Sequence, residues 1–485
     1  MSYEPVIGLE IHVQLATRTK MFCSCALTFG EPPNTRTCPV CLGLPGALPV
    51  ANAAAIHFGL MIGEALGCRL APRSIFHRKN YFYPDLPKGY QISQYDEPLC
   101  LGGQLGDVRI HRVHLEEDAA KLVHASSSGR IHESRASVVD FNRGGTPLAE
   151  IVTEPDLRSG EQAREWLTLL RTTLRQLGVS DVNMEEGSLR CDANISVRRE
   201  GTTELGTKTE LKNMNSFRFL ERGIRAEVAR QVELLEREEE VVQETLHFDP
   251  RSERITSMRS KEEAHDYRYF PEPDLVPVAI SDQMLDAARE AMPELPAARA
   301  QRLEREFSLT RASARQLAFR AELGDFFEAA ALGAKDGGEA DRTATEEVSG
   351  QPLANWVTGE LVARLGDEDP ARSRVEPVAL ATLVAMVERK EVNQGGAKQV
   401  LDRLVAQGGE PRAIVEAEEL GAIAGDDALS DLVDDALAAN ASAADKIRGG
   451  NMKPMGAIIG HVMRETQGRA DGGEVTRLVR EKLGA

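Results

Sequence analysis

The sequence contains none of the short motifs that mark the common nucleotide and zinc-protease sites. Its 485 residues include no G-x-x-x-x-G-K-[ST], no G-x-G-x-x-G and no H-E-x-x-H. These absences exclude a P-loop, a dinucleotide site with the glycine fingerprint and a metalloprotease of the common helical type. Any chemistry must therefore come from polar residues arranged in another way.

Membrane-spanning and secretion signals are also missing. The most apolar stretch, residues 46–63, contains Pro49, Asn52 and His57, and it predicts a buried helix and not a membrane span. The first ten residues, MSYEPVIGLE, have neither the basic nor the apolar segment of a signal peptide. Seven cysteines, an odd number in a long chain, favour a reducing compartment over a disulfide framework. We therefore expect a cytoplasmic protein with no membrane contact.

The sequence has no excess of positive charge, since its formal net charge is −18. Nucleic acid would therefore have to bind at a local basic patch. The C-terminal region offers one, because residues 446–485 hold eight Lys or Arg against four acids, whereas residues 416–444 hold eight acids and no base. A solvated helix surface explains such block asymmetry less well than it explains mixed charge. The candidate basic positions are Lys446, Arg448, Lys453, Arg464, Arg477 and Arg480.

Four of the seven cysteines form two close pairs, Cys23 with Cys25 and Cys38 with Cys41. Tetrahedral zinc is bound by four thiolates that two short turns bring together, so this spacing predicts a zinc site. Four protein ligands leave no open position, and the zinc would therefore be structural. Reduced loop thiols are the alternative. A redox dithiol is disfavoured, because no thioredoxin-like βαβ pattern surrounds residues 38–41.

Strand-like alternation dominates the first 294 residues. Residues 8–15, GLEIHVQL, alternate apolar and polar side chains, and residues 188–198 and 207–213 form a hairpin pattern with charge on one face. A helix is expected over residues 161–177, with Ser159 and Gln162 as its capping box and Gly178 as its stop. We predict an α+β region with a largely antiparallel sheet.

The sequence after residue 295 is rich in Ala, Leu, Glu and Arg and is helical throughout. An exposed connection is expected over residues 334–347, and helix breaks are expected at Gly395 and Gly396. We therefore divide the chain into residues 1–294, a helical domain at 295–408 and a helical tail at 409–485.

Five strings mix carboxylates with Lys, Arg or Asn between apolar residues: 8–15, 79–96, 114–121, 140–156 and 184–217. Hard oxygen ligands and one imidazole for Mg²⁺ would come from Glu10, His12, Glu116, Glu117 and Glu150. Phosphate-binding candidates are Lys79, Lys88, Arg143, Arg190, Lys208 and Lys212. Further candidates for ATP or substrate contacts are Tyr81, Asn142, Ser188, Asp192 and Glu210. A structural ion pair is the alternative for any single one of these residues.

Taken in order, these strings closely resemble the B-subunit family of the tRNA-dependent amidotransferases. The resemblance covers essentially the whole chain, including DYRYFPEPDL at 266–275 and ADKIRGGNMKPMGAIIGHVM at 444–463. It implies a glutamine-synthetase-like cradle domain, then a helical domain and a tRNA-binding tail. It also implies a heterotrimer with two companions, an amidase-type glutaminase (the A subunit) and a small C subunit. The absence of a Gly-Ser-Ser amidase signature from this chain fits such a division of labour.

The resemblance also implies a reaction. ATP would activate the side-chain carboxylate of Glu-tRNA(Gln) or Asp-tRNA(Asn), and ammonia would then give Gln-tRNA(Gln) or Asn-tRNA(Asn). The predicted catalytic metal ligands are Glu10, His12, Glu117 and Glu150. Glu116 can replace Glu117, because a strand through residues 114–118 sends the two side chains to opposite faces and its register is open. A polar gate on the ammonia path is hypothesised from Lys79, Lys88 and Asp192.

Two other functions remain open. One is a noncatalytic, zinc-containing tRNA-binding scaffold, which would show no Glu-tRNA-dependent ATP hydrolysis. The other is an ATP-dependent ligase that acts alone on a free small acid. The basic helical tail argues against the ligase, because a small-molecule enzyme has no need of such a module.

Overall fold

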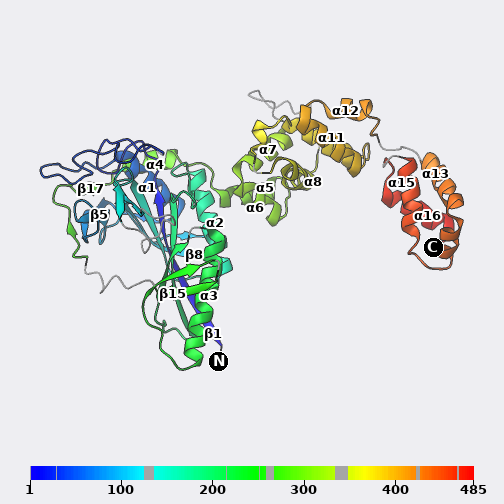
Figure 1. Ribbon diagram of the computed structural model, residues 1–485. Helices are drawn as coiled ribbons and strands as arrows, with labels where there is room; N and C mark the ends of the chain where they lie inside the picture. The colour runs from blue at the N-terminus through cyan, green and yellow to red at the C-terminus, as the bar shows by residue number, and fades with distance from the viewer. Residues whose placement is uncertain are drawn as a thin grey trace. The chain divides into compact units, whose positions relative to one another are not determined.

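The computed structural model describes residues 2–28, 30–124, 136–214, 216–250, 252–257, 267–333, 348–366, 368–421, 426–466 and 469–484. The chain divides into two compact units, Met1–Leu295 and Pro296–Ala485. Every strand of the described residues lies in the first unit (Figure 1). No helix in these ranges is long and apolar enough to cross a membrane. The predicted connection at 334–347 lies outside the described residues.

A ten-stranded sheet forms the first unit, in the order β15-β14-β13-β12-β1-β11-β8-β6-β2, with β7 paired to β8. These strands are β1 (Tyr3–Gln14), β2 (Arg69–Leu70), β6 (Cys100–Leu101), β7 (Gln104–Leu105), β8 (Val108–Glu117), β11 (Pro147–Thr153), β12 (Leu189–Arg199), β13 (Thr209–Met214), β14 (Thr245–Asp249) and β15 (Arg254–Ser257). The pairs are antiparallel except β13 with β14, which are parallel. The mixed sheet agrees with the predicted α+β class.

Smaller strand groups stand beside this sheet. Strands β4 (Phe76–Asn80), β5 (Tyr90–Gln94) and β16 (Phe270–Pro271) form one group, β9 (Lys121–His124) pairs with β10 (Ser137–Asp140), and β3 (Arg73–Ser74) pairs with β17 (Val278–Ala279). Strand β5 contacts β8 of the large sheet. The three-stranded group therefore lies beside β8, the strand that carries Glu116 and Glu117.

Strand β1 lies between β12 and β11 because one of its faces is apolar throughout. Ile7, Leu9, Ile11 and Val13 are each at most 1% exposed, whereas the polar residues between and after them, Glu10, His12 and Gln14, are half-buried. The predicted alternation over residues 8–15 is confirmed, and the strand begins earlier, at Tyr3. A strand of this pattern buries one face and keeps polar groups on the other.

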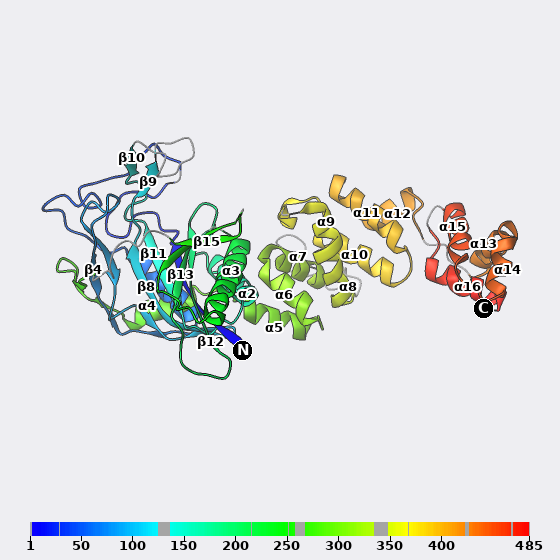
Figure 2. The ribbon, with the colours of Figure 1, turned by 60° about the horizontal axis from the view of Figure 1, so that its bottom comes forward.

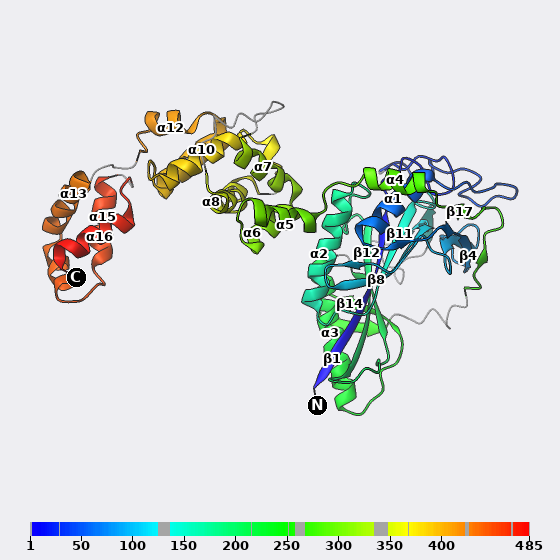
Figure 3. The same cartoon turned by 180° about the vertical axis from the view of Figure 1, so that it is seen from behind.

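Three helices cover the apolar face of the sheet: α1 (Ala53–Ala65), α2 (Gly160–Gln176) and α3 (Phe217–Glu236), with α4 (Asp282–Glu290) beside α1. Gly59 of α1 lies directly against Leu115 of β8, and Gly223 of α3 lies against Leu211 of β13. Trp166 Nε1 of α2 donates to a backbone carbonyl of β7 at 2.8 Å. Helices α2 and α3 run side by side (Figures 2 and 3). The opposite face of the sheet is the one that carries the polar side chains.

The local predictions for α2 and the hairpin are confirmed. Ser159 Oγ accepts from the Gln162 amide at 3.2 Å, and Gln162 Oε1 accepts from the Arg158 amide at 2.8 Å. Gly178 ends the turn after the helix with φ of +69°. Strands β12 and β13 pair antiparallel, as the hairpin pattern indicated. Capping and turn signals are local, which is why the sequence predicted them well.

The second unit consists of helices in its described residues. They are α5 (Pro296–Glu306), α6 (Arg311–Phe319), α7 (Ala321–Leu332), α8 (Gly350–Asn355), a π-helix (Trp356–Leu361), α9 (Val362–Leu365), a 3₁₀ turn (Pro370–Arg372), α10 (Pro377–Glu388), α11 (Gln394–Gln407), α12 (Pro411–Ala417), α13 (Asp426–Ala439), α14 (Ala441–Arg448), α15 (Met455–Glu465) and α16 (Gly472–Leu483). Two separate apolar clusters hold them, one up to α12 and one over α13–α16. Helix α12 thus packs with α10 and α11, although the sequence division places it in the tail.

The predicted helix breaks at Gly395 and Gly396 are wrong. Both glycines lie in the first turn of α11, and the break precedes them at residues 389–393. The side chain of Asn393 accepts from the Gly396 amide at 2.8 Å and caps the helix. A good N-cap therefore outweighs the low helix propensity of two glycines.

Candidate active site

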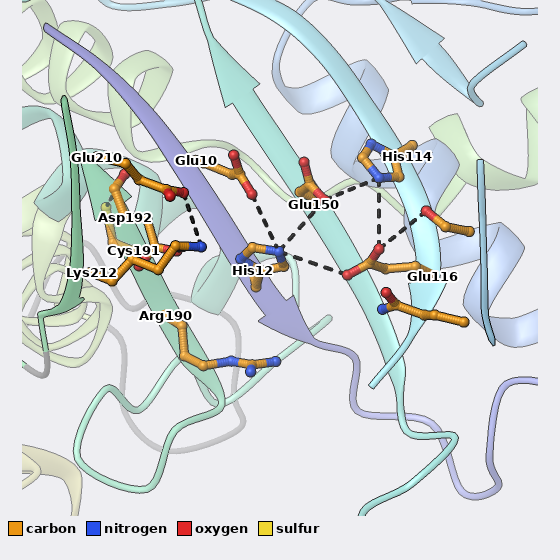
Figure 4. A network of polar contacts seen from close by, with 12 residues as sticks. Glu10, His12, His114, Glu116, Glu150, Arg190, Cys191, Asp192, Glu210 and Lys212 are labelled. Carbon is orange, nitrogen blue, oxygen red and sulfur yellow. Dashed lines mark hydrogen bonds and ion pairs between the residues drawn. The ribbon is translucent and has the colours of Figure 1, made fainter. Parts of the chain in front are cut away.

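His12, Glu150 and His114 lie in one row across three neighbouring strands. The pairing of β1, β11 and β8 sets His12 opposite Glu150, and Glu150 opposite His114. Glu10 lies two residues from His12, and Glu116 lies two residues from His114, so all five side chains point to the same face (Figure 4). The alternation in GLEIHVQL therefore contributes to a cluster of three carboxylates and two imidazoles.

The His12 imidazole is at the centre of this cluster. Its Nε2 is 3.7 Å from Glu10 Oε1, 3.7 Å from Glu116 Oε1 and 3.5 Å from Glu150 Oε2. His114 Nε2 lies 3.1 Å from Glu150 Oε2. Glu116, Glu150 and His114 are buried, whereas Glu10 and His12 are half-buried. The cluster is thus enclosed on one side and open to a substrate on the side of β1.

Burial and neighbouring charge shift the pKa values of these groups. Burial lowers the pKa of His12, but the hydrogen bond and charge of Glu150 and the charges of Glu116 and Glu10 raise it to about 9. Burial raises the pKa of Glu150, yet His114 and His12 hold it well below its usual value. Burial and the charge of Glu150 raise the pKa of Glu10. The carboxylates therefore favour a proton or another cation at His12.

Two overlapping groups in the cluster have the spacing of a cation site. One ligand atom each from Glu10, His12 and Glu150 lies within 4.8 Å of the others, and the same is true of His114, Glu116 and Glu150. Glu150 belongs to both groups. Carboxylate oxygens suit Mg²⁺ and Mn²⁺, and imidazole is acceptable to the transition metals. The donor set therefore fits a divalent cation.

Glu117 does not join this cluster. Consecutive residues of β8 point to opposite faces, and the register turns Glu116 toward His12. Glu117 Oε1 instead accepts from the Ile92 amide at 2.9 Å and pairs with Lys88 Nζ. Of the two alternatives that the sequence left open, Glu116 is therefore the one that faces His12. The strand register decides it.

A second charged patch lies beside the cluster on β12 and β13. Glu10 stands opposite Asp192 in the pairing of β1 with β12. Lys212 Nζ is 2.9 Å from Glu210 Oε1 and 3.4 Å from Asp192 Oδ2. Burial lowers the pKa of Lys212, but the charges of Asp192 and Glu210 outweigh burial and raise it. The predicted residues Asp192, Glu210 and Lys212 are therefore brought together.

Arg190 extends the row of His12 on the other side, since the two residues pair across β1 and β12. One Nη of Arg190 lies 3.0 Å from Asp118 Oδ1, and Gln14 Nε2 donates to Asp118 Oδ2 at 2.9 Å. Arg143 donates to two backbone carbonyls of the same turn, at 3.0 and 2.8 Å. Asp118 thus holds the Arg190 guanidinium beside the row.

Lys79 and Tyr81 reach the same face from β4 and the turn that follows it. Lys79 Nζ lies 4.8 Å from the centre of the Tyr267 ring, and Tyr81 packs edge-on against that ring with centroids 5.9 Å apart. Burial lowers the pKa of Lys79, but nearby negative charge, chiefly that of Glu116, outweighs burial and raises it. Lys79 is therefore a cation held close to the carboxylates.

Three other residues predicted to contact substrate do not join the carboxylate–histidine cluster: Ser188, Asn142 and Lys208. Ser188 Oγ donates to Asn183 O at 3.2 Å and accepts from its amide at 2.8 Å, which closes the turn before β12. The Asn142 side chain makes two hydrogen bonds of 2.8 Å to the backbone of residues 32–36. Lys208 precedes β13 and is exposed. None of these three contacts the carboxylate–histidine cluster in the described residues.

Three residues at the site were not predicted from the sequence: His114, Ser93 and Asp118. The spacing of His114 and Glu116 repeats that of Glu10 and His12, so a second strand with ligands two apart was a usable signal. Ser93 donates to Glu116 Oε2 at 3.1 Å from a different strand. Asp118 acts through Arg190. No local pattern marks these last two, because their contacts depend on the strand order.

The four predicted cysteines converge. Their sulfur atoms all lie within 4.8 Å of one another, and the Cys38 amide donates to Cys41 Sγ at 3.2 Å. Zinc bound at about 2.3 Å to four sulfurs holds them roughly 3.8 Å apart, so the arrangement fits that ion. A hydrogen bond from Cys23, ahead of a smaller effect of Lys20, lowers the pKa of Cys41 to about 4. A cavity of about 200 Å³ extends from Cys23 and Cys41 to the Lys88–Glu117 pair.

The four basic residues predicted to bind tRNA are exposed on α14, α15 and the loop between them. They are Lys446, Arg448, Lys453 and Arg464. Arg448 pairs with Asp445 at 2.9 Å. Lys446, Lys453 and Arg464 have no ion pair within the described part of the tail. This surface therefore offers positive charge that acids of the same helices do not neutralise.

Comparison with known proteins identifies the family. The GatB/GatE catalytic domain matches residues 5–286, which is more than half of the chain, and a GatB domain matches residues 341–483. The chain belongs to the GatB/GatE family. The relatives of this family extend along its whole length, and the two matched regions contain the carboxylate–histidine cluster and the basic tail.

Three relatives are named as the B subunit of an aspartyl/glutamyl-tRNA(Asn/Gln) amidotransferase. The protein of Anaeromyxobacter dehalogenans strain 2CP-1 is 50% identical over 493 residues, covering 99% of each chain. That of Geobacter sulfurreducens is 46% identical over 494 residues, and that of Persephonella marina is 43% identical over 493 residues, each covering 100% of both chains. The expected B-subunit family is thus confirmed.

Proposed function

We propose that the carboxylate–histidine cluster performs the ATP-dependent activation step of tRNA-dependent amidation. Family membership makes the chain the B subunit of an amidotransferase that converts misacylated Glu-tRNA(Gln) or Asp-tRNA(Asn) into Gln-tRNA(Gln) or Asn-tRNA(Asn). The observation that carries the proposal is the row His12–Glu150–His114 across three strands, with Glu10 and Glu116 completing it.

The reaction has two balanced steps. A side-chain carboxylate oxygen of the tRNA-bound amino acid attacks the γ-phosphorus of ATP, and ADP leaves. Neutral ammonia then attacks the acyl carbon of the resulting acyl phosphate, and inorganic phosphate leaves with loss of a proton from nitrogen. Phosphoryl transfer depends mainly on positioning and on compensation of negative charge. A rigid strand row suits that demand better than a loop does.

Glu10, His12, Glu116, Glu150 and His114 are the groups that would hold Mg²⁺. When bound, Mg²⁺ neutralises phosphate charge and aligns the attacking and leaving oxygens. Glu150 is shared by both ligand groups, and its low pKa keeps it ionised as a ligand. The carboxylates keep His12 close, and His114 orients Glu150 from the other side.

The cations around the cluster are suited to phosphate and carboxylate substrates. Arg190 continues the row of His12, while Lys79 and Lys212 stand near the carboxylates on either side. Guanidinium and ammonium groups bind phosphate oxygens by charge-assisted hydrogen bonds. We assign ATP and substrate contacts to these three residues ahead of Ser188, Asn142 and Lys208.

Ammonia and tRNA come from partners in this proposal. Ammonia would be supplied by an amidase-type glutaminase, the A subunit, with a small C subunit completing a heterotrimer. The Lys88–Glu117 pair lines the same cavity as Cys23 and Cys41 and is a candidate for the polar gate, whereas Asp192 is engaged with Lys212. The exposed bases of the tail would bind the tRNA backbone. Charged tRNA places the reaction in the cytoplasm.

The remaining parts of the chain have supporting roles in the same proposal. The first unit is a glutamine-synthetase-like cradle, followed by a helical domain and a tail. The separate apolar clusters of α5–α12 and α13–α16 support a division of the second unit, with the boundary after α12. Structural Zn²⁺ at Cys23, Cys25, Cys38 and Cys41 would hold the cysteine loop that forms one wall of the cavity.

The test is Glu-tRNA-dependent ATP hydrolysis by the complete complex. Glu10→Gln keeps the shape of the side chain and removes its charge, so activation should fall by orders of magnitude while tRNA still binds. Glu4→Gln is the matched control on β1, because Glu4 pairs only with Arg158 and Arg198 among the described residues, at 2.9 and 2.8 Å. Unchanged hydrolysis in Glu10→Gln would remove Glu10 from the activation site, and no Glu-tRNA-dependent hydrolysis in the wild type would favour the noncatalytic scaffold.

A further inference from the structure

Lys20 is a completely buried lysine whose partners are unusual. Its side chain is 0% exposed, and lysine is almost never fully buried without an ion-pair partner. Its Nζ donates to the Phe141 carbonyl at 2.9 Å and to Cys41 Sγ at 3.6 Å. No carboxylate of the described residues lies within 4.0 Å of this nitrogen. The only acidic group that it contacts there is therefore the sulfur of a predicted zinc ligand.

Charge explains why an ammonium group stands in this place. Burying an unpaired ammonium costs several kcal/mol, so an anion must offset it. Four thiolates around a divalent metal carry a net negative charge, and this charge needs hydrogen-bond donors in an interior of low dielectric. One backbone amide, that of Cys38, already donates to Cys41 Sγ. The ammonium of Lys20 supplies the positive charge that the amide does not.

The backbone of Lys20 is anchored so that its side chain must point at the cluster. The Lys20 amide donates to the Cys25 carbonyl at 3.0 Å, and Asn52 Nδ2, which belongs to the N-cap of α1, donates to the Lys20 carbonyl at 3.2 Å. A Cβ on Gly145 would stand 3.3 Å from Lys20 Cδ, so a glycine leaves room for the stem. The lysine is thus fixed to the cysteine loop and to α1.

We propose that Lys20 is the charge-compensating partner of the four-cysteine metal site and raises its affinity for zinc through Cys41. The proposal rests on the zinc site proposed above. It makes Lys20 a positioning residue of that site, distinct from the lysines that face the carboxylate–histidine cluster. Hydrogen bonds to metal ligands of this kind typically change metal affinity by about 10- to 100-fold.

The test is the zinc affinity of the full-length protein, measured by competition with a chromophoric chelator. Lys20→Met keeps the length of the side chain and removes its charge, so the dissociation constant for zinc should rise by about 10- to 100-fold. Lys121→Met, which removes an exposed lysine of β9, is the matched control and should leave zinc affinity unchanged. An unchanged dissociation constant in Lys20→Met overturns the proposal.

A second measurement separates charge compensation from packing. Lys20→Met should lower the melting temperature more in zinc-loaded protein than in chelator-stripped protein, because the stripped cluster no longer holds a fixed negative charge. An equal decrease in both would overturn the proposal. If Lys20→Met does not fold, the same measurement is made on Lys20→Gln. A zinc affinity equal to that of the wild type in Lys20→Gln also overturns the proposal. Wild-type protein that contains no zinc refutes the metal site itself. If the wild type binds zinc and the Lys20 variant binds it with the same affinity, only the role of Lys20 is refuted.

Discussion

The two units of the chain differ in how many charged side chains they bury. The first unit buries many ionisable side chains, namely Lys20, His77, His114, Glu116, Glu117, Asp118, Glu150, Glu227 and Glu272. Among the described residues of the second unit, Arg299 is the only charged side chain buried to that degree. Buried charge costs free energy unless partners or ligands compensate it. The first unit therefore depends on partners that compensate its buried charges, whereas the second unit depends mainly on apolar packing.

The largest effect on activity is expected from Glu150, and a second buried glutamate of the first unit, Glu227, serves as its comparison. Glu150→Gln removes the carboxylate that we propose as the shared cation ligand, so ATP-dependent activation should fall by about 10²- to 10³-fold or more, and high Mg²⁺ should restore part of it. Phosphorylation of the tRNA-linked carboxylate in the complex is the measurement. Assembly with the glutaminase should survive, and so should tRNA binding.

Glu227→Gln is the matched control for this change. Glu227 is 0% exposed and accepts from Thr209 Oγ1 at 2.8 Å and from Arg230 Nε at 2.7 Å, and it lies on α3 away from the polar face. Its loss should lower the melting temperature and leave activation by the folded protein normal. A Glu150→Gln protein that behaves like Glu227→Gln would make Glu150 a structural residue.

The stability of the second unit should fall most when a substitution leaves a cavity in its apolar core. Phe327 of α7 is 0% exposed and packs edge-on against Phe307 with centroids 5.1 Å apart. Phe327→Ala should destabilise this unit by about 3–5 kcal/mol, measured by denaturant unfolding followed with a probe in residues 296–485. Activation per folded molecule should not change. A loss below about 1 kcal/mol would contradict the apolar account of this unit.

Loss of the cysteine cluster should have an intermediate effect in the first unit. Cys38→Ser removes one of four converging thiolates, so bound zinc should disappear and the melting temperature should fall. The ATP-dependent step should stay largely intact, because none of Glu10, Glu116 and Glu150 lines the cavity beside Cys23 and Cys41. Metal analysis and melting curves test the first claim, and ATP hydrolysis tests the second. Loss of the chemistry in protein that remains folded would give the metal a role beyond structure.

Surface charge in the tail should affect binding and not folding. Lys446, Lys453 and Arg464 are exposed and have no ion pair within the described residues. Replacing all three with Ala should raise the KM for charged tRNA by about tenfold and flatten its salt dependence. Glutaminase activity without tRNA and the melting temperature should stay the same. An unchanged KM would remove tRNA binding from this surface.

The same contrast explains which features the sequence could predict. Alternation in β1, the caps of α2 and the spacing of the cysteines are local signals, and each predicted a structure that formed. The choice between Glu116 and Glu117 depended on the register of β8 against β11, which no local pattern contains. Ser93 and Asp118 joined the site through strands far away in sequence. The glycines at 395 and 396 predicted a break because glycine has a low helix propensity, whereas the Asn393 side chain caps α11 at the Gly396 amide.

The smallest expected effect belongs to the exposed ion pairs of the second unit. Arg403 of α11 and Glu418, which follows α12, lie 2.6 Å apart, but their side chains are 54% and 33% exposed. An exposed pair of this kind contributes about 0–1 kcal/mol, because water screens the charges and two long side chains must be ordered. Arg403→Ala should therefore change the free energy of unfolding by less than about 1 kcal/mol, and the change should shrink further in high salt. Denaturant unfolding at two salt concentrations checks this, with Phe327→Ala as the reference for a true core contact. A salt-independent loss as large as that of Phe327→Ala would mean that this unit, too, depends on charge.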